Sequence, residues 1–158
     1  MADAAQWQKL ASALRDLHRA LLERARRDYE RERGGGVTPG QLLQLLATYP
    51  YFEWLRSLSE LMVDLDSLRD AAPALMEEVA TAVRPAVEYF ILVPRTKQAA
   101  HPFADRYWPY VQDDPHVAMA HAAVKQTIAS WPLPQGTDAA TLLHERHRLS
   151  EKARHRLR

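Results

Sequence analysis

The sequence contains no cysteine and only five glycines, and each scarcity excludes a class of structure. Without cysteine there is no disulfide framework, no thiolate nucleophile and no cysteine-ligated zinc or iron–sulfur site. Five glycines against ten prolines argue against a loop-rich β architecture. The 158 residues are enough for one domain of ordinary size and too few for two.

Long apolar runs are missing as well. No uncharged apolar run approaches the roughly 20 residues that a membrane span needs. The first residues do not combine a basic stretch with a following apolar stretch, so we expect no signal peptide. Together with the absence of cysteine, these features predict a cytoplasmic protein with no membrane partner.

The net charge of +1 gives no global reason to expect a polyanionic partner, but it conceals an uneven distribution. Residues 1–33 carry eight basic and six acidic side chains, and residues 50–93 carry three basic and eight acidic ones. Residues 137–158 carry six basic and three acidic side chains. The acidic middle and the basic ends could attract one another within the fold or between subunits, although solvated faces are the simpler interpretation.

Apolar residues recur at helical spacing along three segments. In the first segment, successive intervals of three and four residues predict a helix over residues 4–32, which the glycines at 34–36 end. The same intervals predict a second helix over residues 50–70 and a third over 73–93, with Pro73 opening the third and Pro85 kinking it. The members of the first seam are Trp7, Leu10, Leu14, Leu17 and Leu21.

Two Thr/Asp–Pro pairs mark further helix starts. Thr38-Pro39 predicts a short helix over 39–48, and Asp114-Pro115 predicts one over 115–130. A short helical piece is expected over 106–111, and no segment indicates a strand. We therefore predict an all-α fold, an antiparallel helical bundle of about four main helices (4–32, 50–70, 73–93 and 115–130), with the two short helices capping its ends.

The last part of the chain differs from the rest. We predict a helical-bundle domain over residues 1–131, followed by a linker and a basic C-terminal amphipathic helix or tail over residues 132–158. Its apolar content is thin, so it can dock on the bundle, bind a partner or fray.

Histidine and carboxylate are the only metal-ligating groups available. His144, His147, Glu151 and His155 follow at intervals of three, four and four, which places them on one helical face and suits zinc, nickel or copper. Surrounding arginines oppose a dication, so this is a weak metal site and no cofactor is predicted. Glu53, Glu60 and Asp64 share another face, which we interpret as solvated.

Two polar residues on apolar helices are candidates for holding a ligand inside the bundle. His18 lies beside the leucines of the first seam, and Glu88 lies on the helix predicted over 73–93. Either could face an internal cavity and bind a small molecule, haem or metal. The simpler interpretation of His18 is a boundary histidine hydrogen-bonded to backbone or to a carboxylate.

Nucleic acid is an unfavoured partner. The basic residues of 144–158 wind around the expected helix and are interrupted by Glu145 and Glu151. Residues 39–63 resemble a helix-turn-helix in spacing only, because the second helix starts with apolar and acidic side chains where base-reading groups are required.

Aromatic residues cluster around residue 106 and provide the last candidate site. Such a short aromatic segment with an arginine can anchor an interface, or it can seal the end of the bundle as core. The candidate interaction residues are Phe103, Arg106, Tyr107, Trp108 and Tyr110.

The sequence contains no Gly-x-Ser-x-Gly, no phosphate-binding glycine loop and no dinucleotide fingerprint. We therefore predict a non-enzymatic helical bundle that acts through protein–protein interaction or self-association, most simply as a homodimer. A regulatory role is compatible with this prediction. The alternatives are a small-ligand or metal-binding sensor and, less favoured, nucleic-acid binding through the basic C-terminal segment.

Overall fold

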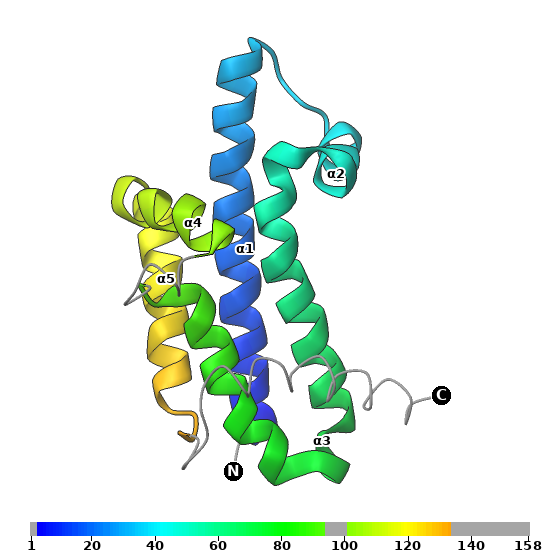
Figure 1. Cartoon of the computed structure of the whole chain (residues 1–158), viewed down its shortest axis with the longest axis vertical. Helices are drawn as coiled ribbons and strands as arrows, with labels where there is room; N and C mark the ends of the chain where they lie inside the picture. The colour runs from blue at the N-terminus through cyan, green and yellow to red at the C-terminus, as the bar shows by residue number, and fades with distance from the viewer. Residues whose placement is uncertain (1–2, 94–100, 134–158) are drawn as a thin grey trace.

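The computed structural model describes residues 3–93 and 101–133, and this part of the chain is helical and contains no strand (Figure 1). The all-α prediction is confirmed for these residues. Six helices pack against one another. They are α1 (Ala4–Arg33), α2 (Pro39–Thr48), the 3-10 helix η1 (Pro50–Phe52), α3 (Glu53–Ile91), α4 (Pro102–Asp113) and α5 (Pro115–Ala129).

The long first helix has the ends that its sequence predicts. The Asp3 side chain accepts a hydrogen bond from the Gln6 backbone N–H, and the Gln6 side chain accepts one from the Asp3 N–H. This reciprocal pair satisfies two donors that a helix start leaves free. At the other end Gly34 adopts φ +79°, a left-handed conformation that glycine accepts without steric cost. Helix α1 packs against both α3 and α5.

Helix α3 corrects one sequence prediction. It runs from Glu53 to Ile91, so the predicted division into helices 50–70 and 73–93 at Pro73 is wrong. A proline inside a helix removes one backbone hydrogen bond and bends the helix without necessarily ending it. Figure 1 shows that α3 turns sharply at its lower end, and its later, green arm approaches α5.

Helices α4 and α5 follow one another almost directly. The predicted piece at 106–111 is part of the longer α4, whose first turn is capped by the His101 side chain. Asp114 caps α5 as predicted, and its side chain accepts from the backbone N–H groups of His116 and Val117. In the part of the chain that the structure describes, no helix is both long and apolar enough to cross a membrane.

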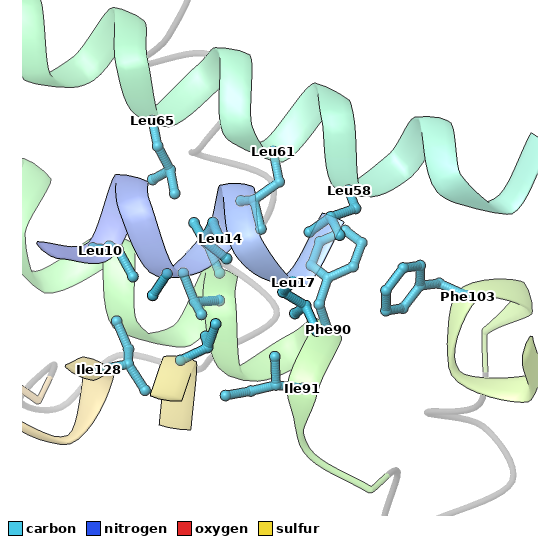
Figure 2. Close-up of a cluster of buried hydrophobic side chains, with 14 of the residues drawn as sticks. Leu10, Leu14, Leu17, Leu58, Leu61, Leu65, Phe90, Ile91, Phe103 and Ile128 are labelled. Atoms are coloured by element: carbon cyan, nitrogen blue, oxygen red, sulfur yellow. The ribbon is translucent and has the colours of Figure 1, made fainter. Parts of the chain in front are cut away.

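The core forms where the apolar seams meet. Figure 2 shows Leu58, Leu61 and Leu65 of α3 on one side of α1, opposite Ile91 and Ile128. Each fully buried leucine contributes about 1.5–3 kcal/mol relative to an exposed one. Four α1 leucines that lie at the centre of this core have 0–1% of their surface exposed: Leu10, Leu14, Leu17 and Leu21. The predicted seam of α1 is therefore its buried face.

Candidate interaction surface

Two of the aromatic residues predicted to contact a partner lie inside the protein. Phe103 is 2% exposed, and its ring centroid is 5.0 Å from that of Phe90. Tyr107 is completely buried, and its hydroxyl lies 2.6 Å from Nδ1 of His121 on α5. Burial raises the pKa of Tyr107, so its phenol stays protonated. These two rings attach α4 to α3 and α5 and are not available to a partner in this structure.

The other three residues of the α4 stretch lie closer to the surface. Trp108 is half-buried, with its ring centroid 5.3 Å from that of His121. Tyr110 is half-buried beneath the Arg24 guanidinium, which lies 5.2 Å from the ring centroid. Arg106 is exposed, and its guanidinium stands 5.4 Å from the Tyr51 ring centroid. Of the five predicted interaction residues, only Arg106 is therefore exposed.

His18 joins α1 to α3. Its Nε2 lies 3.0 Å from the Ser59 hydroxyl, and burial lowers the pKa of its imidazole. The Ser59 hydroxyl can also donate to the Leu55 carbonyl at 3.3 Å. The simpler interpretation, a boundary histidine hydrogen-bonded to backbone or to a carboxylate, is wrong about the partner, which is a serine hydroxyl.

Glu88 belongs to the contact between α3 and the end of α5. It accepts a 2.8 Å hydrogen bond from Nε of Arg84. Nη1 of Arg84 then donates to the carbonyl oxygens of Ala129 and Trp131, at 3.2 and 2.9 Å. Because the last carbonyls of a helix have no intrahelical donor, this arginine satisfies the Ala129 carbonyl at the end of α5, together with the Trp131 carbonyl just beyond it. Glu88 thereby holds Arg84 in place.

The histidine and carboxylate positions and one small cavity bear on the ligand and metal predictions. Among the residues whose side chains the structure describes (3–70, 81–93 and 101–133), no three histidine or carboxylate side chains are grouped so that they could hold a metal ion. His144, His147 and Glu151 lie outside the described residues, as does the predicted C-terminal helix. A cavity beside Trp7 and Met62 has a volume of ≈ 20 Å³, which is room for about one water.

One of the three acidic residues that were interpreted as a solvated face is buried. Glu53 and Glu60 are exposed, but Asp64 has only 2% of its surface exposed. Its spacing explains the difference, because Asp64 is three residues after Leu61 and four before Leu68, both of which are core residues. The solvated-face interpretation is wrong for this residue.

Asp114 is a polar site whose long-range contacts the sequence analysis missed. It is 4% exposed and accepts hydrogen bonds from Nη2 of Arg27 at 3.0 Å and Nη1 of Arg24 at 3.5 Å. Burial opposes its ionisation, but the N–H groups at the start of α5 and Arg24 outweigh it and lower the pKa of Asp114. Its Asp-Pro pair signalled the cap, whereas nothing local signalled arginines 87 and 90 residues away.

Helix α2 is the element with the least burial. None of its residues is buried, although four of its ten residues are leucines. Leu42, Leu45 and Leu46 are partly buried and pack against the core cluster. Leu43 points elsewhere and keeps 71% of its surface exposed. Figure 1 shows α2 at the periphery, beside the upper end of α3.

Gly40, Leu43, Gln44 and Ala47 lie three and four residues apart, so they share one side of α2, and all four are exposed. We call this side the α2 outer face. The segment that contains it, residues 34–52, has no charged side chain, in a chain in which 26% of residues are charged. This charge-free run was the sequence signal that could have indicated the surface.

Comparisons of the chain with protein-family models, with curated proteins and with solved structures found no match.

Proposed function

We propose that this protein acts by binding another protein molecule through the α2 outer face, without catalysis of its own. The observation that carries the proposal is Leu43, a leucine 71% exposed on a helix that buries none of its residues. Single exposed apolar side chains are ordinary on protein surfaces. A leucine-rich helix that is peripheral, uncharged and incompletely covered is different, because binding would remove the apolar surface of Leu43 and Ala47 from water, beside the uncharged amide of Gln44.

The polar pairs of the described residues support a non-catalytic role. The His18–Ser59, Tyr107–His121 and Arg84–Glu88 contacts each join or position helices, at 3.0, 2.6 and 2.8 Å. None of these groups lines the cavity beside Trp7. They contribute to the packing of the fold, which leaves the surface as the functional region.

We also propose how the helices are arranged as a bundle. The contacts of α1 with α3 and α5, and of α3 with α5, support an antiparallel bundle of four main segments: α1, the two arms of α3, and α5. Helices α2 and α4 then close one end of that bundle. Residues 132–158 would form a separate linker and tail.

Site-specific photocrosslinking tests the proposed surface. A photoreactive amino acid replaces Leu43 in one variant and Met119 in a control variant. Met119 is a fair control because it is 73% exposed on α5, outside the α2 outer face. We expect a defined crosslinked product in native extract from position 43 and none from position 119. Absence of product at position 43, or equal product at both positions, would overturn the proposal.

A further inference from the structure

We propose that helix α4 docks through contacts that require neutral imidazoles at His101 and His121, so that acid releases it from α3 and α5. This inference does not depend on the α2 outer face. The two histidines flank α4, because His101 directly precedes it and His121 lies on α5. Each places Nδ1 against a hydrogen-bond donor of α4, the Ala104 N–H or the Tyr107 hydroxyl. An imidazole nitrogen accepts a hydrogen bond only while it carries no proton.

His101 caps the first turn of α4. Its Nδ1 accepts from the Ala104 backbone N–H at 3.3 Å, and its Nε2 lies 3.0 Å from the Tyr89 carbonyl oxygen, to which it must donate. The Nε2 bond and the ring stack on Tyr89, with centroids 4.2 Å apart, are compatible with either charge state. A proton on Nδ1 would instead face the Ala104 N–H and put a positive charge at the positive end of the helix dipole. Protonation of His101 therefore removes the cap of α4.

His121 holds the middle of α4. Its Nδ1 lies 2.6 Å from the hydroxyl of Tyr107, which is completely buried. Because burial raises the pKa of Tyr107, the phenol keeps its proton and donates it to Nδ1. A proton on Nδ1 would take this acceptor away from a buried hydroxyl, which is costly. Burial also lowers the pKa of His121, so the docked state opposes protonation and acid in turn opposes docking.

The groups around the two rings favour the neutral forms. The charged side chain that acts on His121 is Lys125, one turn later on α5, and its charge opposes a second cation. The acidic residue in the first turn of α4, Asp105, is exposed, so water and salt screen its charge from His101. From α1, Arg24 lies over Tyr110, at the other end of α4. Aromatic rings make up the remaining contacts: Tyr89, Phe90 and Phe103 around His101, and Tyr107 and Trp108 around His121.

Helix α4 can leave without the rest of the fold. It has 12 residues, of which Phe103, Ala104 and Tyr107 are buried, and Pro109 inside it lacks a backbone donor. A helix this short is marginal on its own, so its contacts decide whether it stays in place. The start of α5 is held separately, because Asp114 pairs with arginines of α1. Helix α4 is therefore a unit that can open locally.

Hydrogen–deuterium exchange of the full chain tests the release. Exchange is followed by mass spectrometry at about pH 7.5 and about pH 5, which bracket the usual titration of histidine, with rates corrected for the intrinsic effect of pH. We expect the protection of α4 to fall at least about tenfold at the lower pH. Helix α1, with its buried leucine seam, should keep its protection.

Three variants assign the effect to the two imidazoles. His101→Asn keeps a side-chain acceptor at the cap, and His121→Gln keeps one for Tyr107, but neither new side chain titrates. Each variant should reduce the loss of α4 protection in acid, and the double variant should abolish it. His116→Asn is the matched control, because His116 is an exposed histidine on α5, and it should behave as the wild type does.

The outcomes decide the proposal. Equal protection of α4 at both pH values overturns it, and so does a loss that persists in the double variant. Simultaneous loss in every helix indicates global acid unfolding and overturns local release. NMR of the wild-type histidine rings provides a check that needs no variant. Release of α4 at the pH at which His101 or His121 gains its proton supports the proposal, and release at any other pH contradicts it.

Discussion

Replacing Asp114 should show how strongly the start of α5 is tied to α1. Asp114 performs two tasks with one carboxylate: it caps α5 through the backbone N–H of His116, and it pairs with Arg24 and Arg27. Two substitutions separate these tasks. Asp114→Ala removes both, whereas Asp114→Asn keeps a capping oxygen and removes the charge.

The expected magnitudes follow from burial. Loss of an N-cap costs about 1 kcal/mol. Removing one partner of a fully buried ion pair costs about 3–5 kcal/mol, but this pair is only partly buried. The side chains of Arg24 and Arg27 are 21% and 49% exposed, and Arg24 keeps its contact with Asp28. We therefore expect a loss of about 2–3 kcal/mol for Asp114→Ala and about 1–2 kcal/mol for Asp114→Asn.

Urea denaturation followed by circular dichroism measures both losses, provided that the m value stays constant. The pH dependence provides a second check. Because the folded protein lowers the pKa of Asp114, its stabilisation is complete above the unfolded value of about 3.9 and disappears as the pH falls through the folded value. The wild type and the Ala variant should converge in acid. A loss below about 0.5 kcal/mol for Asp114→Ala at pH 7 would refute the reasoning.

Three further predictions concern separate parts of the fold. Leu17→Ala should cost about 2–5 kcal/mol in urea denaturation, because Leu17 is completely buried; a smaller loss would contradict the packing. Gly34→Ala should cost about 1 kcal/mol in thermal denaturation, because φ is +79°. Burial lowers the pKa of His121, so the contribution of its neutral imidazole to the free energy of unfolding is lost as the pH falls below about 6.5 through the folded value. His121→Gln should flatten this fall of the free energy of unfolding with pH. An unchanged slope of the free energy of unfolding against pH would contradict the prediction.

Local features of the fold could be predicted from the sequence because local physics decides them. Thr38-Pro39 and Asp114-Pro115 start helices where expected, since a capping side chain and a proline act within one turn. Gly34 ends α1 for an equally local reason. The α1 seam identified its buried face because a regular helix fixes which side chains share a side.

Features that depend on distant contacts could not be predicted in this way. Pro73 was expected to open a new helix, but a proline's local preference is overridden when both flanking arms continue the helix. Asp114 carries a local cap signal and no signal for Arg24 or Arg27. His18 was recognisable as a boundary residue, but its partner Ser59 lies 41 positions later in another helix.

The sequence favours α4 as the interaction surface, whereas the structure favours α2, for a related reason. Apolar content alone favours Phe103 and Tyr107 over Leu43 as anchors, because aromatic rings contribute more area to an interface. The fold reverses that order, because α4 inserts its rings between α3 and α5 while α2 has neighbours on only one side. A side chain can serve an interface only if its own fold has not already covered it. On that criterion the leucine of a short, uncharged helix is a better anchor than the largest rings in the chain.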